Sequence, residues 1–561
     1  MRANKVLLLL ASLGTFALLL VAMVQENFLK DWRRIQLTAQ ARGEGVEVRL
    51  RQIVVPALHV TDRCVTCHVG MAPGEQGIAG VPVLAPHPSV GHDPAAYGCT
   101  VCHAGQGRAT DKADAHGTVP FWPTPMLPRE FTYAGCGSCH THLRVPDLAQ
   151  LRHGRALLEQ YDCLACHRLD NRGGTLRPAG GGMEGPDLSR VGATGYRKDW
   201  YEDHLLRRAK AALVQRQAEA AQGPWRASFA PMPGADREAI EVALASSVGA
   251  PGLVEAKALF HSLGCRGCHK VGGVGGDDGP DLTRIGERDP GRLDFANVPG
   301  APTLAGWLAE HFRNPAALVP GSKMPILRLD EQEIRLLTLY MLSLRRSDVP
   351  EAFWPKDRIL AERFGEREFA ADGATLFGSF CAACHGPDGR GRRYPGMPPF
   401  PSIANPDFLA LASDAFIMET VRQGRPGRRM AAWDRDGGLT AAEIAAVVAH
   451  IRRLGGDVRL EPDRRPPRWV EGDPEAGRRL FAASCAGCHG PQGQGGEGPA
   501  LHNKVLLGAA TDTYLVETIR RGRRGTAMEG FAGPTIVRPA LAGAEIESIV
   551  AFLRTWEEKK P

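Results

Sequence analysis

The sequence has no cysteine outside one repeated motif. All 14 cysteines fall in pairs with the spacing Cys-X-X-Cys, and a histidine follows the second cysteine of every pair. No thiol remains for a structural disulfide or for a nucleophile. A zinc site would pair two such motifs or add spaced histidines, and a thioredoxin-like motif would open the helix of a βαβ unit. Neither explains a histidine after every pair.

The seven pairs have the pattern of haem c attachment sites. The two thiols of Cys-X-X-Cys-His bond to the porphyrin vinyl groups, and the imidazole binds the iron. We therefore predict seven haem c groups as iron cofactors. The predicted thioether cysteines are Cys64, Cys67, Cys99, Cys102, Cys136, Cys139, Cys163, Cys166, Cys265, Cys268, Cys381, Cys384, Cys485 and Cys488. The predicted proximal iron ligands are His68, His103, His140, His167, His269, His385 and His489.

Aromatic residues are also scarce, at 6% of the chain, whereas glycine and proline are abundant. This composition suits small haem domains, because the porphyrin supplies much of the apolar core and loops wrap around it. The formal net charge is +6, but each haem brings about two propionates, so seven haems could offset the whole excess. The charge therefore gives no support to nucleic-acid binding.

One long apolar run, Val6 to Val24, follows Arg2 and Lys5. Its length is close to the roughly 20 residues that span a bilayer as a helix. A cleaved signal peptide and a retained anchor are the two interpretations, and the anchor is favoured because no small-X-small cleavage site follows the run. We predict one N-terminal helix in the cytoplasmic (inner) membrane, with the haem domains on the periplasmic side.

Three motifs crowd into the stretch before residue 150, which leaves too little chain for three separate haem folds. They are predicted to share one domain and to need a second axial ligand for each iron. The available histidines are His59, His87, His92, His116, His142 and His153. We predict His87, His92 and His116 as the distal ligands, and which of them serves which iron stays open.

From residue 151 the chain repeats one order of parts four times: a short helix, a motif, a loop rich in glycine and proline, a methionine, and an amphipathic closing helix. The second closing helix is predicted to begin with an Asp330/Glu333 capping box and to bury Ile334, Leu337, Met341 and Leu344. The third is predicted to have a Thr440/Glu443 box and a buried stripe at Ile444, Val447, Val448 and Ile451. Such an internal repeat is a strong fold signal.

The methionine before each closing helix is the predicted distal ligand of its unit. These are Met232, Met324, Met430 and Met528. Met183 and Met397 are the competing candidates in the first and third units. A neutral thioether favours ferrous iron and raises the reduction potential relative to a second imidazole. The predicted ligands therefore imply lower potentials near the membrane and higher ones away from it.

Together these patterns predict a mainly α chain: an N-terminal transmembrane helix, a loop-rich trihaem domain, then four small helical haem domains in tandem, which resemble cytochrome c domains. The predicted bounds are 1–28 for the anchor, 29–150 for the trihaem domain, and 151–250, 251–350, 366–458 and 471–561 for domains 1 to 4.

Two resemblances support this division. His87-Pro88, Gly98 to Thr110 and Ala115-His116-Gly117 resemble the multihaem c subunits found beside cytochrome b and other quinol-oxidising partners in respiratory complexes. This resemblance covers roughly residues 30–150 and implies membrane-linked electron transfer. The four repeated units, covering most of residues 151–561, resemble tandem class I cytochromes c.

The predicted function is electron carriage, because every predicted haem has a sixth ligand and no CxxCK variant marks an open iron. The expected partners are the membrane, a cytochrome b-like or other quinol-oxidising membrane subunit, and a soluble cytochrome c or terminal oxidase or reductase as acceptor. No catalytic residue is predicted. The alternative is a multihaem oxidoreductase that acts on a small inorganic substrate at one open haem, so whether the chain is itself an enzyme stays open.

Overall fold

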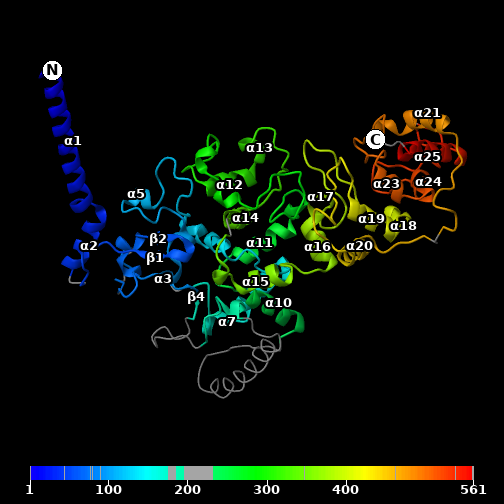
Figure 1. Cartoon of the computed structure of the whole chain (residues 1–561). Coiled ribbons are helices and arrows are strands. Elements are labelled where there is room, and N and C mark those ends of the chain that lie inside the picture. Colours follow the sequence, from blue (N-terminus) through cyan, green and yellow to red (C-terminus); the bar gives the residue numbers. More distant parts are fainter. Residues whose placement is uncertain are drawn as a thin grey trace, which may run out of the picture.

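Helices dominate the structure, a computed structural model that describes residues 2–558 apart from 43–44, 76, 79, 82, 89, 175–184, 195–231, 346–347, 461–462 and 537. The strands among the described residues are two or three residues long and form two separate hairpins. The predicted mainly α fold is confirmed. In Figure 1 helix α1 projects at one end of the molecule, and the last helices lie at the opposite end.

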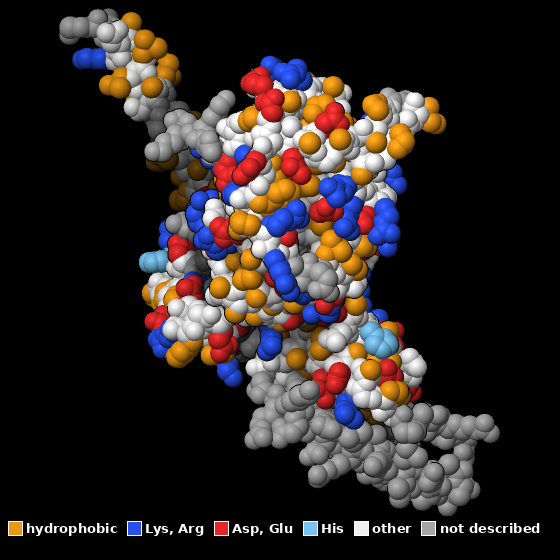
Figure 2. Space-filling model, turned by 90° about the vertical axis from the view of Figure 1, so that its right-hand side faces the viewer, with side chains coloured by type: hydrophobic (Ala, Val, Ile, Leu, Met, Phe, Trp, Pro, Cys, Tyr) orange, Lys and Arg blue, Asp and Glu red, His pale blue; other side chains and the backbone are white. Residues whose placement is uncertain are grey.

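Helix α1 (Arg2–Phe28) is the one helix among the described residues that is long and apolar enough to cross a membrane. Its leucines are exposed, and in Figure 2 it projects at the upper left with mostly hydrophobic side chains on its surface. Exposed apolar surface is unfavourable in water but not in a bilayer. Helix α2 (Asp31–Ala41) packs on the next domain, where Gln36 donates hydrogen bonds to the carbonyls of Arg49 and Thr66 at 2.9 and 2.7 Å.

The first three motifs lie among short helices and one hairpin. Strand β1 (Ile53–Val55) pairs antiparallel with β2 (Val60–Asp62), so that Ile53 lies opposite Asp62. The buried apolar clusters here are small, as expected where haem supplies the core. The helices of this domain are η1 (Pro56–Leu58), η2 (Cys64–Thr66), η3 (Val69–Met71), α3 (Pro94–Tyr97), α4 (Thr100–His103), α5 (Lys112–Ala115) and η4 (Arg129–Ser138).

Domain 1 is built on a close crossing of two helices, α6 and α10. A Cβ added at Gly154 of α6 would lie 1.9 Å from the Ala239 carbonyl oxygen of α10, so only glycine allows this approach. Its described elements are α6 (Leu148–Gln160), α7 (Cys163–Cys166), β3 (Arg168–Leu169), β4 (Arg172–Gly173), η6 (Val191–Thr194) and α10 (Gly234–Ala245).

Domain 2 confirms the predicted closing helix, α14. Asp330 and Glu333 form the capping box, and Ile334, Leu337 and Met341 are buried. Leu344 ends the helix and packs against the same core. The elements of this domain are α11 (Leu253–Ser262), η9 (Cys265–Gly267), η10 (Ile285–Glu287), η11 (Pro290–Arg292), α12 (Leu304–Arg313), α13 (Pro315–Leu318) and α14 (Glu331–Ser343).

The segment between domains 2 and 3 is folded onto the trihaem domain. It contains η12 (Glu351–Phe353) and α15 (Lys356–Phe364). The ring centroids of Phe353 and Tyr97 are 5.5 Å apart. The carboxylate of Asp357 lies 3.8 Å from Nδ1 of His140.

Domains 3 and 4 have the same order of helices. The predicted Thr440/Glu443 capping box is present, and the stripe from Ile444 to Ile451 is buried. The helices of domain 3 are α16 (Gly373–Phe380), α17 (Ala382–His385), α18 (Pro406–Leu411), α19 (Asp414–Gln423) and α20 (Ala441–Gly455). Those of domain 4 are α21 (Pro474–Ser484), α22 (Ala486–His489), α23 (Lys504–Ala509), α24 (Asp512–Arg521) and α25 (Gly543–Glu558).

These two domains pack on each other reciprocally, as two copies in a symmetric dimer do. The N-cap residue of α18, Asn405, donates to the Arg524 carbonyl at 2.9 Å, and the N-cap residue of α23, Asn503, donates to the Pro426 carbonyl at 3.3 Å. Between these contacts the equivalent rings of Phe416 and Tyr514 pack with centroids 4.7 Å apart. One apolar core runs through both domains.

Candidate functional site

Every attachment motif forms the same single helical turn. In all seven, the histidine backbone N–H donates to the carbonyl of the first cysteine at 2.9–3.0 Å. Residues three and four positions apart share one face of such a turn. The turn therefore places two thiols and one imidazole on the same side, as covalent attachment of one flat group requires.

The histidine ring is held by a proline carbonyl in each of the last four motifs. Nδ1 lies 2.8–2.9 Å from that oxygen. A carbonyl can only accept, so Nδ1 carries the hydrogen and Nε2 carries the lone pair, the form of imidazole that binds a metal. The pairs are His167 with Pro186, His269 with Pro280, His385 with Pro401, and His489 with Pro499.

A glycine precedes the proline in three of these pairs and packs flat against the histidine ring. An added Cβ would lie 2.4 Å from Cε1 of His167 at Gly185, and 2.3 Å from Cε1 of His269 at Gly279. At Gly498 it would lie 2.8 Å from Cε1 of the His489 ring. A side chain at these positions would push the imidazole out of place. Domain 3 departs from the pattern, with Phe400 at the corresponding position.

In the region of the first three motifs, two of the predicted distal histidines lie beside predicted proximal ones. The ring centroids of His87 and His103 are 6.1 Å apart, and those of His92 and His140 are also 6.1 Å apart. Two imidazoles that each bind one metal at about 2 Å have centroids about 6 Å apart. His116 is the predicted ligand near His68, whose pKa it helps to lower. The structure thus brings His87 and His92 to two different motifs.

Burial keeps the proximal histidines of this domain neutral. It lowers the pKa of His68, His103 and His140 below the usual 6.5, and for His140 the nearby Asp357 opposes the shift in part. A neutral imidazole has the lone pair that a metal needs. Nδ1 of His68 and Nδ1 of His140 are buried without a hydrogen-bond partner.

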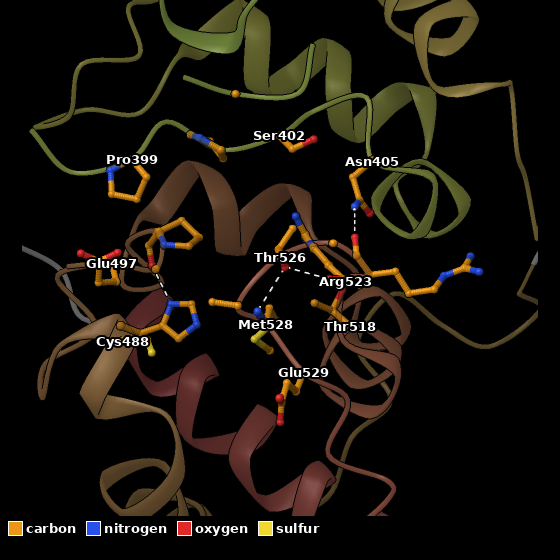
Figure 3. A pocket seen from close by; sticks show the side chains of 18 of the residues that line it. Pro399, Ser402, Asn405, Cys488, Glu497, Thr518, Arg523, Thr526, Met528 and Glu529 are labelled. Atoms are coloured by element: carbon orange, nitrogen blue, oxygen red, sulfur yellow. Dashed lines mark hydrogen bonds between the residues drawn. The ribbon is translucent and has the colours of Figure 1, made fainter. Parts of the chain in front are cut away.

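A cavity with a volume of about 930 Å³ lies between domains 3 and 4. His489 and Met528 both line it, together with Cys485 and Cys488. Figure 3 shows Cys488 and Met528 facing this space, with Pro399, Ser402 and Asn405 of domain 3 at its far wall. The volume falls in the range of ligand pockets. Apolar side chains that could contact a porphyrin also line it (Phe481, Leu515, Phe531, Ile549 and Leu553), together with six arginines (Arg390, Arg392, Arg393, Arg523, Arg524 and Arg538).

The predicted methionine ligands are half-buried, in keeping with a role at a cofactor. Met232 packs in the same apolar cluster as Cys163, and Met430 and Met528 pack against the core shared by domains 3 and 4. The competitor Met397 accepts a hydrogen bond from Arg429 through its sulfur, at 3.2 Å. Met183 lies outside the described residues. Met324 is half-buried, and its N–H donates to Ser322 Oγ at 3.3 Å.

Two polar groups that the sequence reasoning missed lie on α12 of domain 2. The rings of Trp307 and His311 stack at 4.9 Å, and neither Trp307 Nε1 nor His311 Nδ1 has a partner although both are buried. Burial, with His269 and Arg288 adding to the effect, lowers the pKa of His311 to about 4. Such unpaired groups can bind haem carboxylates. Their spacing of four residues on one helix face was the only signal in the sequence.

Neighbouring motifs contact one another at three places. The N–H of Thr100, in the second motif, donates to the carboxylate of Asp62, two residues before the first motif, at 2.8 Å. A Cβ added at Gly264, just before the fifth motif, would lie 2.5 Å from the backbone nitrogen of Ala383 in the sixth. A Cβ at Gly135, which precedes the third motif, would lie 1.9 Å from the carbonyl oxygen of Cys102. The attachment segments therefore do not sit in isolated domains.

Comparison with known families agrees with the geometry. Residues 368–451 and 472–553 match the family described as cytochrome c oxidase, cbb3-type, subunit III, and residues 253–345 match the family described as cytochrome c. These matches cover domain 2, domain 3 and domain 4.

Among similar proteins, the cbb3-type cytochrome c oxidase subunit FixP of Bradyrhizobium sp. (strain ORS 278) is 36% identical over 30% of this chain and 57% of its own length. Subunit CcoP of Azospirillum sp. (strain B510) is 30% identical over 28% of this chain and 53% of its own length. The chain thus spans just over half the length of the curated relatives it matches. It contains cytochrome c domains and an N-terminal apolar helix, and its matched residues are similar to the CcoP and FixP subunits of cbb3 oxidases.

Proposed function

We propose that the chain holds seven haem c groups, one on each motif, and carries electrons between a quinol-oxidising membrane partner and periplasmic acceptors. Bound haem supplies a one-electron ferrous/ferric couple. The observation that carries this proposal is the pairing of imidazoles at 6.1 Å in the trihaem domain. An iron with a protein ligand on both sides has no position for a substrate, so carriage is favoured over catalysis.

The proposed distal ligands follow from the same geometry. His87 is the distal ligand of the haem iron at His103, and His92 is that of the iron at His140. The remaining His116 is the distal ligand of the iron at His68. Each later domain uses its methionine. Met430 is preferred to Met397 because the sulfur of Met397 already accepts a hydrogen bond from Arg429. The methionine ligands are Met232, Met324, Met430 and Met528.

The ligand types set a direction for the electrons. Bis-histidine haems lie next to the membrane helix, and histidine–methionine haems extend away from it. A thioether raises the potential, so electrons enter near the bilayer and leave through the distal domains. A redox titration with spectral assignment tests this order. It fails if the methionine-ligated haems are no more oxidising than the others.

The partners are proposed from the fold and from the relatives. One helix cannot build a quinol site alone, so a cytochrome b-like or other quinol-oxidising membrane subunit is the donor. The relatives are named as subunits of cbb3 oxidases, which favours a terminal oxidase, or a soluble cytochrome c that leads to one, as the acceptor. The haem domains then lie on the periplasmic side of the cytoplasmic membrane.

Purification from detergent-solubilised membranes tests the partnership. The chain, tagged at its C-terminus, should co-purify with a membrane subunit, and a quinol should reduce its haem c within seconds. A chain lacking residues 1–28 but exported to the periplasm is the control, and it should lose both properties. Isolation of the full chain alone, with haem c that quinol cannot reduce in the membranes, would overturn the proposal.

A further inference from the structure

A buried ionic cluster lies where three domains meet. The carboxylate of Glu368 is 2.7 Å from Nζ of Lys257 and 2.8 Å from Nη2 of Arg266, and His261 Nε2 is 3.7 Å away. The side chains of Lys257, His261 and Arg266 are at most 5% exposed, and that of Glu368 is 13% exposed. Removing one member of such a group leaves an uncompensated buried charge.

The members of this cluster come from segments far apart in the chain. Lys257 also donates to the carbonyl of Leu143, at 2.8 Å, just after the third motif. The backbone N–H of Val145 donates to the Glu368 carbonyl at 2.5 Å, and Val145 pairs with Phe369 as a parallel bridge. Glu368 therefore connects three segments: the end of the domain that contains the first three motifs, helix α11 of domain 2, and the start of domain 3.

Two attachment motifs lie directly beside this cluster. Arg266 is the second residue of the domain 2 motif, and its Nη1 also donates to the carbonyl of Val271 at 3.0 Å. The ring of His261 is 3.1 Å from Ser379 Oγ on α16, the helix that leads into the domain 3 motif. Between them the two motifs are in backbone contact, because a Cβ added at Gly264, just before Cys265, would lie 2.5 Å from the backbone nitrogen of Ala383. Thiols of this motif bond to the porphyrin edge, so the two attachment edges adjoin.

We propose that Glu368 is a positioning residue that holds the motif Cys265–His269 against the motif Cys381–His385, so that the haems of domains 2 and 3 form one fixed electron-transfer junction. This inference rests on the proposed haem content. Transfer across the junction moves one electron: one iron goes from ferrous to ferric as the other goes from ferric to ferrous, and no bond or proton changes. The segment 348–367 then acts as a packed connection and not as a tether for a mobile domain.

The test uses the full-length holoprotein with Glu368→Gln, and Glu366→Gln, an exposed neighbour, as the matched control. Haems at a fixed short separation give a two-signed Soret circular dichroism signal. Glu368→Gln should weaken this signal and slow electron transfer between the two haems, measured after flash photoreduction, by about tenfold or more. Haem content should not change. Glu366→Gln should match the wild type in every readout.

A second variant distinguishes a change in haem position from a failure to fold. Lys257→Met combined with Glu368→Gln removes the Lys257–Glu368 ion pair and leaves no lone ammonium, and the Arg266 guanidinium keeps its hydrogen bonds to the carbonyls of Val271 and Val274. It should fold, keep its haem, and show the same weakened signal and slower transfer. A wild-type signal and rate in either variant that retains its haem would overturn the inference. Absence of haem from these two motifs in the wild type would instead overturn the proposed function.

Discussion

Replacement of Gly498 by alanine tests how the protein positions an iron ligand. The new Cβ would lie 2.8 Å from Cε1 and 2.9 Å from Nδ1 of His489, whereas ordinary contacts begin at 3.4 Å. The ring must therefore move by about 0.6 Å. It cannot do so freely, because the Pro499 carbonyl holds Nδ1 at 2.8 Å.

The displacement is large on the scale of a metal–ligand bond. Such bonds tolerate deviations of about 0.2 Å, so the iron–His489 bond should weaken or break. Overpacking of this kind also costs about 1–3 kcal/mol of folding stability. The effect should be confined to domain 4, because the atoms nearest to a Cβ at Gly498 all belong to the His489 ring.

Carbon monoxide binding to the fully reduced, full-length protein measures the result. Gly498→Ala should gain one CO-reactive haem per chain relative to the wild type. Gly508→Ala is the control, because this residue lies in α23 of the same domain and an added Cβ meets nothing within 4 Å. If Gly498→Ala binds no more CO than Gly508→Ala and melts at the same temperature, the contact of Gly498 with the His489 ring does not position this iron ligand.

Three further predictions follow from other contacts. Met528→Ala should open one haem to CO and lower its reduction potential in a redox titration, and unchanged values would exclude Met528 as a ligand. His92→Ala should remove the distal ligand of the haem at His140. EPR would report this as loss of a low-spin signal and gain of a high-spin signal. The partners of Glu368 outweigh its burial and lower its pKa from 4.5 to about 2. Its ionised form therefore adds up to about 3 kcal/mol above pH 4.5, and this is lost as the pH falls through about 2. The difference in urea midpoint between the wild type and Glu368→Gln should shrink over that interval, and a constant difference would contradict the ion cluster.

Local signals in the sequence predicted local structure well. The two capping boxes and the buried stripes of α14 and α20 are present, because each depends on residues within a few turns of one helix. The helical turn of the motifs is equally local.

Contacts between distant residues could not be predicted. Which distal histidine meets which motif depends on how irregular loops fold back, and neither helical nor strand periodicity describes such loops. The Glu368 cluster joins side chains more than 100 residues apart. The glycines that contact the histidine rings could be seen in the sequence as Gly-Pro pairs at Gly185 and Gly279. Their contact with the rings appears only in three dimensions.

The central claim is that every motif carries a haem whose iron has two protein ligands. Quantitative EPR of the fully oxidised, full-length protein tests it most directly, because the integrated signal counts ferric haems and its type reports their ligation. The account predicts seven low-spin haems per chain and no high-spin signal. Fewer than seven haems, or a high-spin signal equal to one haem or more, would contradict it.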